Sequence, residues 1–359
     1  MAMGVGIKSV SYVVPEQVRT NAFWREKYPE MVARAEKNSA AKLWAKRDAR
    51  APNTFDRMME PYLGDPFRGA VERRVLADHE SGLTMETQAA REALEAVRWS
   101  PSEVDLVLVS SFLPDQFGPG NAAYLVKELG TRCPGINLES ACSSALVSLN
   151  TAIGLVQAGQ YRNALVVTSC SYSRMAPEDD AMSWISGDGA GAILVGEVPE
   201  GRGWLAQHTV NTSSTCGAFR VKIVFDPEQG AVPRVESSKD TARIINETGE
   251  PVMRDACFGA LEKAGLGVDD VACFVVNTPT AWYADFACAV TGIARDKTVS
   301  TYERFANVGT ALLPINLHES LREGLVHDGD YVLLYSVGSV STAVATVLRW
   351  SDAMLGPAH

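Results

Sequence analysis

The stretch EALEAVRWSPSEVDLVLVSS, residues 92–111, lies over GALEKAGLGVDDVACFVVNT, residues 259–278, at a shift of 167 residues without a gap. Each copy has the pattern of an amphipathic helix, a short turn and a continuous apolar strand of the kind that is buried on both faces. The same shift places NALVVTSC (163–170) over DYVLLYSV (330–337), a second apolar strand. Coincidence between two generic helix-strand units is the alternative, and the second match weighs against it. The sequence therefore predicts a duplicated unit.

Alternating helices and strands within each copy predict an α/β protein with mostly parallel sheets. We expect two similar halves packed together, an N-terminal half at 1–200 and a C-terminal half at 201–359. Residues 20–70 are charged, helix-prone and rich in Trp, Tyr and Met, and they have no counterpart in the second half. We predict that they are an insertion that caps the core or the mouth of a pocket.

The composition of the 359 residues, with 46% apolar and 21% charged residues, is that of a globular protein. The net charge of −10 argues against nucleic acid or an anionic membrane as the main partner. No apolar run is long enough to cross a bilayer and no signal-peptide pattern is present, so we expect a cytoplasmic protein. Seven cysteines without a CxxC pair indicate neither a metal site nor a disulfide framework, and we interpret them as free thiols.

One cysteine stands near the front of a run of small residues, NLESACSSALVSLNTAIGLVQAGQY (137–161). The pattern predicts that NLESA ends a strand and turns, and that CSSALVSLNTAIGLVQAG forms a helix closed by Gly159. Cys142 would then lie at a helix N-terminus, where unpaired N–H groups and the macrodipole lower the pKa of a thiol and favour a nucleophilic thiolate. The alternative is that Cys142 is a small buried apolar residue, as most free cysteines are.

Several segments together resemble the thiolase-fold condensing enzymes, and specifically β-ketoacyl-acyl-carrier-protein synthase III. They are ESACSSAL, NALVVTSCS, SWISGDGAGAILVGE and the C-terminal stretch that begins RFANVGTALLPINLHE. The resemblance runs from about residue 5 to the C-terminus, apart from residues 20–70. It implies a duplicated αβαβα five-layer sandwich, which accounts for the repeat, and it implies a homodimer.

The resemblance also implies a mechanism. A thioester of coenzyme A or of an acyl carrier protein transfers its acyl group to a cysteine, and Cys142 matches that position. A second thioester then loses carbon dioxide and attacks the acyl-enzyme through carbon, helped by a histidine and by an asparagine that Asn307 in RFANVGT matches. The oxyanion is held by backbone N–H groups, which here are those of Cys142 and of Ser339 in SVGSVST, unless that loop is a plain turn. Neither a metal nor a redox cofactor is implied.

The histidine of the family is missing from its expected position. An ungapped match through CFVVNTPTAWYADFACAVTGI puts Asn277 there, although Thr278 or Thr280 could face the site instead. Among the five histidines, only His208 has a position that the sequence leaves open. An amide keeps a hydrogen-bond donor but is not a useful base near neutral pH. We therefore predict that polarisation of a carbonyl is retained and that general-base chemistry is lost.

Two contacts with substrate follow from the same comparison. FRGAVERRVLA (67–77) resembles the segment that contacts coenzyme A, with Arg68 at the position of an arginine that meets the nucleotide end. The alternative is that Arg68 is a solvated surface charge. FLPDQFGPGNAA (112–123) matches the loop that reaches across the dimer to the partner's acyl pocket, with Phe117 nearest the aromatic residue of that loop. The alternative for Phe117 is a plain loop aromatic.

The sequence thus predicts thioester-dependent acyl transfer through a Cys142 acyl-enzyme, in a specialised secondary-metabolite or polyketide pathway. Loss of the histidine also allows a catalytically silent thiolase-fold subunit that binds a carrier protein or another partner, and a thioester hydrolase is a third alternative. Retention of Cys142, Asn307 and GDGAGA (187–192) favours the enzyme. The acyl chain, its donor, and whether the acceptor atom is carbon, nitrogen or oxygen stay open.

Overall fold

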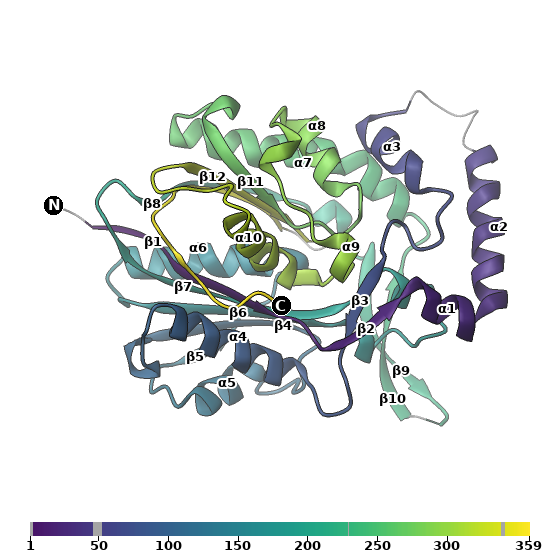
Figure 1. Cartoon of the computed structure of the whole chain (residues 1–359), viewed down its shortest axis with the longest axis horizontal. Helices are drawn as coiled ribbons and strands as arrows, with labels where there is room; N and C mark the ends of the chain where they lie inside the picture. The colour runs from purple at the N-terminus through teal and green to yellow at the C-terminus, as the bar shows by residue number, and fades with distance from the viewer. Residues whose placement is uncertain (1–2, 46–51, 229, 339–341) are drawn as a thin grey trace.

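The strands form two main β-sheets in the computed structural model, which describes residues 3–45, 52–228, 230–338 and 342–359 (Figure 1). The first sheet has the order β14-β1-β7-β6-β4-β5, and the second has the order β11-β12-β13-β8. The first consists of β1 (Gly4–Val13), β4 (Leu106–Phe112), β5 (Gly135–Asn137), β6 (Ala164–Ser171), β7 (Asp188–Val198) and β14 (Met354–Leu355). The second consists of β8 (Gly203–Asn211), β11 (Val271–Val276), β12 (Tyr331–Val337) and β13 (Thr342–Arg349).

The second sheet repeats the strand pairing of the first. β4 pairs parallel with β6, β6 pairs antiparallel with β7, and β7 pairs antiparallel with β1. In the same way β11 pairs parallel with β12, β12 antiparallel with β13, and β13 antiparallel with β8. The predicted duplication is confirmed. The prediction of mostly parallel sheets holds for the first sheet, where three of five neighbouring pairs are parallel, but is wrong for the second, where one of three is. Antiparallel neighbours such as β12 and β13 need only a short connection, whereas parallel strands need a long crossover.

Helices and sheets alternate as five layers (Figure 1). Two helices cover the outer face of the first sheet, two lie between the sheets, and two cover the outer face of the second sheet. In that order they are α4 (Gly82–Ala96), α5 (Asn121–Leu129), α6 (Ser144–Gln157), α10 (Leu312–Arg322), α7 (Thr241–Ala264) and α8 (Tyr283–Thr291). This is the αβαβα sandwich of the thiolase-like fold, as predicted.

The central helix α6 lies against both sheets. Its fully buried face includes the small residues Ala145, Ser148 and Ala152, which let the strands approach the helix closely. As predicted, Gly159 closes this helix. It has a φ of 70°, which glycine adopts without steric cost, and its N–H donates to the carbonyl of Val156.

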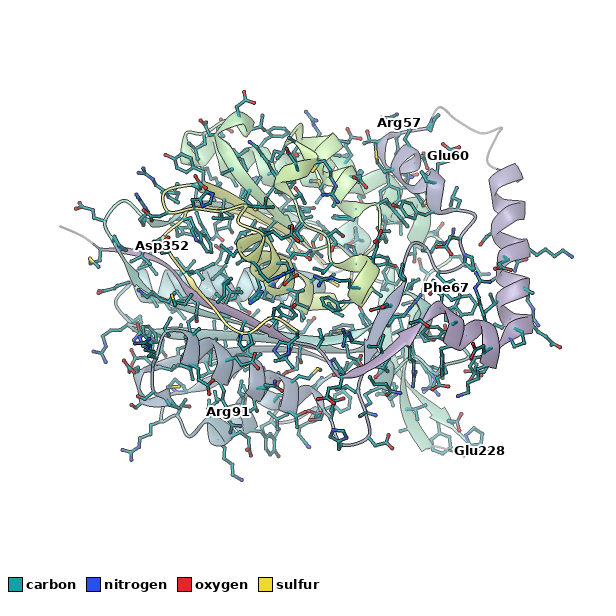
Figure 2. All side chains as sticks on the ribbon, viewed as in Figure 1. Arg57, Glu60, Phe67, Arg91, Glu228 and Asp352 are labelled. Atoms are coloured by element: carbon teal, nitrogen blue, oxygen red, sulfur yellow. The ribbon has the colours of Figure 1, made fainter. Side chains whose placement is uncertain are left out.

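The predicted insertion at 20–70 contributes helices that pack on both halves. Trp24 packs against Phe67, which lies between β3 and α1 (Figure 2). Phe55 packs against Trp282 of the C-terminal half, with ring centroids 6.2 Å apart. The elements of this region are β2 (Gln17–Thr20), α1 (Asn21–Lys27), α2 (Pro29–Ala45), α3 (Thr54–Met59), η2 (Glu60–Tyr62) and β3 (Glu72–Val75). A role in capping a pocket stays a prediction.

Short elements position the segments that form the candidate site. They are the turns η4 (Ala141–Ser143), η5 (Tyr172–Arg174), η6 (Ala181–Trp184) and η10 (Gly309–Ala311), the helix α9 (Tyr302–Phe305) and the hairpin of β9 (Phe219–Asp226) and β10 (Gly230–Ser237). Among the residues that the structure describes, none of the helices is both long enough and apolar enough to span a membrane.

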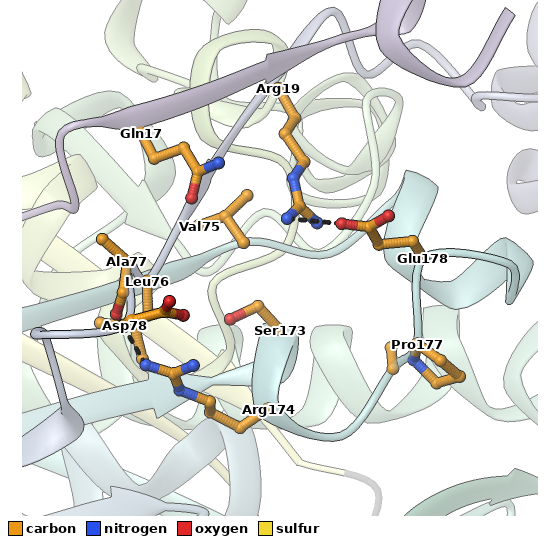
Figure 3. A pocket seen from close by; sticks show the side chains of 11 residues that line it. Gln17, Arg19, Val75, Leu76, Ala77, Asp78, Ser173, Arg174, Pro177 and Glu178 are labelled. Atoms are coloured by element: carbon orange, nitrogen blue, oxygen red, sulfur yellow. Dashed lines mark hydrogen bonds and ion pairs between the residues drawn. The ribbon is translucent and has the colours of Figure 1, made fainter. Parts of the chain in front are cut away.

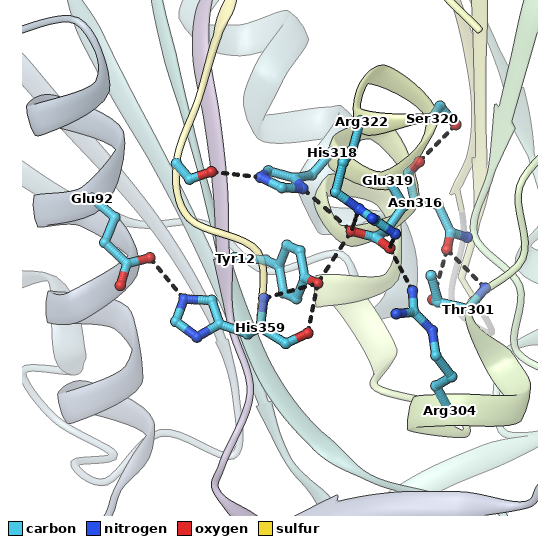
Figure 4. A network of polar contacts seen from close by, with 11 residues as sticks. Tyr12, Glu92, Thr301, Arg304, Asn316, His318, Glu319, Ser320, Arg322 and His359 are labelled. Atoms are coloured by element: carbon cyan, nitrogen blue, oxygen red, sulfur yellow. Dashed lines mark hydrogen bonds and ion pairs between the residues drawn. The ribbon is translucent and has the colours of Figure 1, made fainter. Parts of the chain in front are cut away.

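A buried carboxylate on α10 joins this helix to α9 and β1 (Figure 4). The Glu319 side chain is fully buried and accepts hydrogen bonds from Arg304 at 2.5 Å, Arg322 at 2.8 Å and the Tyr12 hydroxyl at 3.2 Å. Burial raises the pKa of Glu319, but the hydrogen bonds from His318, Arg322 and Arg304 outweigh it and hold the pKa well below its usual range. Glu319 therefore fixes the helices on either side of the segment that carries Asn307.

The chain passes from one sheet to the other near residue 200. β7 ends at Val198 and β8 begins at Gly203, while the short edge strand β14 returns from the C-terminus to the first sheet. The division into halves at 1–200 and 201–359 stays a proposal, which this change of sheet supports.

Candidate active site

Cys142 and Asn307 lie on two similar turns, one in each half. Cys142 is in η4, directly before α6, and Asn307 comes shortly before η10 and α10; η4 and η10 pack against each other. The residues that precede them, Ala141 and Ala306, have positive φ angles of 46° and 56°. Alanine rarely adopts this conformation, and such strained backbone is concentrated at functional sites. The duplication thus brings the predicted nucleophile and the predicted donor together.

The helix behind Cys142 begins two residues later than predicted. α6 starts at Ser144, so Cys142 lies in the preceding 3-10 turn and is not the first residue of the α-helix. Two side chains hold this turn. The Ser336 hydroxyl at the end of β12 donates to the Cys142 carbonyl at 2.9 Å, and the Glu139 carboxylate accepts from the Ala141 N–H at 2.5 Å.

The prediction of a lowered pKa for the Cys142 thiol is wrong for this structure. Burial raises the pKa of Cys142 to about 11, and the negative charge of Glu139 adds to the rise. Hydrogen bonds from the backbone N–H of Cys142 and from the Tyr172 hydroxyl act in the opposite direction but do not compensate. The thiol is therefore protonated at neutral pH in the resting site.

Asn307 presents an amide N–H that is free to bind a ligand. Its Oδ1 accepts from the N–H of Gly309 at 2.9 Å, and its backbone pairs with Ile185 and Gly187, each at 3.0 Å. Within the described residues, Nδ2 has no hydrogen-bond partner, and the side chain is partly exposed. The turn thus holds the Asn307 oxygen and leaves the Nδ2 donor available, as a carbonyl-binding role requires.

Asn277 is fully buried at the end of β11, and its amide pairs with the backbone of β12. Oδ1 accepts from the N–H of Val337 at 3.2 Å and Nδ2 donates to the carbonyl of Val337 at 3.3 Å, which extends the parallel ladder by one pair. One hydrogen of Nδ2 is left for a second acceptor. Of the alternatives, the Thr278 hydroxyl accepts from Asn316 at 2.9 Å, whereas the buried Thr280 hydroxyl has no hydrogen-bond partner among the residues that the structure describes. Which of the three faces substrate stays a prediction.

The histidines bond elsewhere. His208 lies on β8 and bonds Asp255 and Lys263, and its side chain is partly exposed. His318 bonds the carbonyl of Gly356, and His359 bonds Glu92. His79 and His327 are exposed. No hydrogen bond found among the described residues joins a histidine to Cys142, Asn277 or Asn307.

Tyr172 is a buried tyrosine that lowers the pKa of the Cys142 thiol, and the sequence analysis did not identify it. It directly follows β6, is 8% exposed, and packs with Cys170 and Met175. Burial raises the pKa of Tyr172 well above its usual value, so the hydroxyl stays protonated. The available signal was its place immediately after the buried strand NALVVTSCS.

The predicted oxyanion hole is described in part. Among the described residues, the backbone N–H of Cys142 has no partner outside its own residue, which leaves it available to an oxyanion. Ser339 lies outside the described residues. Its neighbour Gly338 donates to the carbonyl of Thr342 at 3.2 Å, directly after the segment that Ser336 ties to Cys142. The pair of donors stays a prediction.

The Arg68 side chain is half-buried and holds the backbone of η2. Its Nη1 donates to the carbonyls of Tyr62 at 2.8 Å and Leu63 at 2.7 Å, and burial lowers the pKa of the guanidinium. These bonds occupy one of its two terminal nitrogens. Contact of Arg68 with the nucleotide end of a thioester therefore stays a prediction. Such a contact would have to be made by the other terminal nitrogen, Nη2.

Phe117 projects from the loop between β4 and α5 and is 75% exposed. Glu86 is fully buried and accepts from Ser111 on one side of this loop and from Asn121 on the other. Burial raises the pKa of Glu86 to about 7 against the effect of these hydrogen bonds. The loop is thus anchored at both ends, while reach of Phe117 into a partner's acyl pocket stays a prediction.

A polar cleft of about 500 Å³ lies beside Ser173 (Figure 3). Arg19 pairs with Glu178 at 2.8 Å, and Arg174 donates to two backbone carbonyls. Neither Cys142 nor Asn307 lines this cleft, and its arginines already have partners, so we assign it no ligand. The described residues contain no group of three or more His, Cys, Asp or Glu side chains that could hold a metal ion.

Two duplicated α/β halves, with a cysteine turn facing an asparagine turn between two sheets, define a thiolase-fold condensing enzyme. The chain matches the family model described as 3-Oxoacyl-[acyl-carrier-protein (ACP)] synthase III over residues 136–213, and the model for its C-terminal part over residues 261–350. It is 30% identical over 296 residues to the β-ketoacyl-[acyl-carrier-protein] synthase III of Desulfitobacterium hafniense (strain Y51), covering 79% of this chain and 88% of that protein. The chain belongs to the β-ketoacyl-[acyl-carrier-protein] synthase III family, and it is an acyltransferase of that family.

Solved structures agree with the fold. The β-ketoacyl-[acyl-carrier-protein] synthase III of Thermus thermophilus superposes with a TM-score of 0.77 at 27% identity, covering 97% of this chain and all of that one. The priming β-ketosynthase from the R1128 polyketide biosynthetic pathway has a TM-score of 0.79 at 23% identity, covering 98% of this chain and 97% of that one. The second likeness is one of fold alone.

Proposed function

We propose that this protein moves an acyl group from a thioester to Cys142 and then to an acceptor that needs no general base. The observation that carries the proposal is the pair of opposed turns, which sets the Cys142 thiol against the free amide donor of Asn307. The donor thioester is acyl-coenzyme A or an acyl carrier protein. Cys142, Asn307 and Asn277 are the catalytic residues, and the N–H groups of Cys142 and Ser339 hold the oxyanion.

The proposed site offers hydrogen-bond donors but no general base, and this limits which second substrates can react. A malonyl-type thioester generates its own carbanion by losing carbon dioxide, so it needs its carbonyl held by amide N–H groups and no proton removed. An amine is nucleophilic without help, whereas an alcohol gains about 10²- to 10⁴-fold from a base. The acceptor is therefore a decarboxylating extender or an amine. The absence of the family's histidine supports a role in a specialised secondary-metabolite or polyketide pathway rather than in the initiation of fatty-acid synthesis.

Assembly as a homodimer in the cytoplasm is part of the proposal. β5 is the edge strand of the first sheet and leaves Ile136 46% exposed, and Phe117 is exposed on the loop before α5. Exposed apolar side chains at a sheet edge are typical of an interaction surface. Pairing of two copies along this edge would bury them and bring Phe117 to the partner, while Arg68 would contact the arriving coenzyme A.

The proposal is tested by offering three acceptor classes to the protein together with acyl-coenzyme A or acyl carrier protein. We expect product, measured by mass spectrometry, with a malonyl thioester or with a primary amine, and about 10²-fold less or none with an alcohol of the same size. Cys142→Ala should form none of these products above the uncatalysed rate. Efficient ester formation or simple hydrolysis by the wild-type protein would contradict the proposal, because both need a base.

A further inference from the structure

Ser336 is a buried polar residue at the point where the second sheet meets the cysteine turn. It lies near the end of β12, is fully buried, and shares its face of the strand with Val332 and Leu334. Those two side chains pack in the apolar core around α6, whereas the Ser336 hydroxyl donates to the carbonyl of Cys142 at 2.9 Å. The last inward position of this strand thus holds the peptide of the predicted nucleophile.

This hydrogen bond joins the two halves of the chain. Among the described residues, the other side-chain hydrogen bonds of residues 139–144 connect members of the turn to each other. They shape the turn, and the bond from Ser336 adds a fixed point on the second sheet. It runs from a strand of the C-terminal half to a turn of the N-terminal half.

Ser336 is itself held in place by Asn277. The backbone N–H of Asn277 donates to the carbonyl of Tyr335 at 3.2 Å, and the side-chain amide pairs with the N–H and the carbonyl of Val337. Asn277 therefore bonds the residue before Ser336 and the residue after it. A short path of hydrogen bonds and β12 backbone runs from the Asn277 amide to the Cys142 peptide.

We propose that Ser336 is a positioning residue, whose hydroxyl holds Cys142 at a fixed place relative to Asn277. The proposal rests on the proposed function, in which Cys142 carries the acyl group and Asn277 offers an amide donor to the second substrate. Both groups must meet the same pair of reactants, and misplacement by about 1 Å costs up to about 10²-fold in rate. Ser336 acts through the Cys142 peptide, because its side chain is fully buried and its hydroxyl proton is already donated.

Thr346 provides a matched control for a purely structural effect. It lies on β13, which pairs with β12, and it is also fully buried. Its hydroxyl exchanges hydrogen bonds with Asn150 of α6, at 2.8 and 3.1 Å. Thr346→Val removes a buried bond between the second sheet and α6, as Ser336→Ala removes one to the turn before α6, but it leaves the Cys142 peptide untouched.

The first measurement is the carbonyl ¹³C signal of Cys142 in the whole protein, labelled with carbonyl-¹³C cysteine and ¹⁵N serine. In this sequence only Cys142–Ser143 and Cys170–Ser171 then give a signal through the peptide bond, so the second pair is an internal reference. We expect Ser336→Ala to move the Cys142 signal upfield, since it removes a hydrogen bond to that carbonyl, and to leave the Cys170 signal in place. Thr346→Val should move neither signal.

The second measurement is transfer from acylated Cys142 to the acceptor in a single turnover. We expect Ser336→Ala to slow it about 10- to 100-fold, while the acceptor concentration at half-maximal rate changes less than about threefold, because no contact with substrate is lost. Thr346→Val should stay within about twofold of the wild-type rate. In an Asn277→Ala background, Ser336→Ala should cost much less, since the group relative to which it places Cys142 is gone.

An unchanged Cys142 signal in Ser336→Ala would overturn the proposal. An equal loss of transfer in Thr346→Val would also overturn it, since general loosening would then explain both, and an equal effect of Ser336→Ala with and without Asn277 would refute the coupling. The carbonyl measurement needs no acyl donor. A wild-type protein that forms no acyl-enzyme would refute the proposed function, and with it a role of Ser336 in transfer, whereas a shifted signal would still establish the hydrogen bond.

Discussion

Asn307→Asp is expected to slow transfer of the acyl group from Cys142 to the acceptor about 10²- to 10³-fold and to leave acylation of Cys142 close to the wild-type rate. Aspartate keeps the oxygen that accepts from the N–H of Gly309, so the turn is retained. It removes the free Nδ2 donor, which we expect to bind the carbonyl of the second substrate. The two steps are separated by single-turnover measurements, first with donor alone and then with acceptor added to the acylated protein.

Asn307→Ala is the companion variant, because it removes both the donor and the hydrogen bond that shapes the turn. It should lose at least as much transfer as Asn307→Asp. Transfer by Asn307→Asp at the wild-type rate would show that Nδ2 is not the donor, and loss of acylation in the same variant would show that Asn307 acts in the first step. Either result would require a different assignment of the second-substrate site.

Glu319→Gln is expected to lower the free energy of unfolding by about 3 kcal/mol, the lower end of the range for breaking a buried ion pair. The carboxylate is fully buried, but its partners Arg304 and Arg322 are about half exposed, so water offsets part of the loss. Because the pKa of Glu319 is held below its unfolded value, its contribution is present above about pH 4.5 and is lost as the pH falls further. Urea unfolding at pH 7 and at pH 4 measures both effects.

The control is Glu323→Gln, an exposed residue at the end of the same helix, which should change stability by less than about 0.5 kcal/mol. At pH 7 the two variants should differ. Below about pH 4.5 the difference should begin to shrink, because the Glu319 carboxyl of the unfolded wild-type protein takes up a proton while that of the folded protein stays ionised. Equal stability of Glu319→Gln and wild type at pH 7 would mean that the buried network does not stabilise the fold.

The fold could be predicted because duplication leaves a pattern that a single sequence carries within itself. The helix-strand units at 92–111 and 259–278 have the same lengths and turns, and the structure gives them matching places in α4–β4 and α7–β11. The direction of β7 and β13 could not be predicted in this way. A run of apolar residues shows that a strand is buried but not whether its neighbour runs parallel to it.

The site could be predicted only for residues whose type suits the chemistry and whose place in the repeated unit is recognisable from the sequence. Cys142 and Asn307 each stand before a helix of the repeated unit, and the structure brings them to opposed turns. Tyr172 was missed because it lies 30 positions from Cys142 in the chain, and its place directly after the strand NALVVTSCS is too weak a signal to relate it to that cysteine. The pKa of Cys142 was predicted in the wrong direction because burial, which depends on the whole fold, outweighs the local effect of the turn.

The central claim is that Cys142 carries the acyl group, and intact-protein mass spectrometry after incubation with a panel of acyl-coenzyme A and acyl-carrier-protein thioesters tests it most directly. We predict an adduct of one acyl group on the wild-type protein and on Cys216→Ala, which removes an exposed cysteine, and no adduct on Cys142→Ala. The thioester that gives the adduct identifies the donor. No adduct across the panel, or an adduct that persists in Cys142→Ala, would contradict the account.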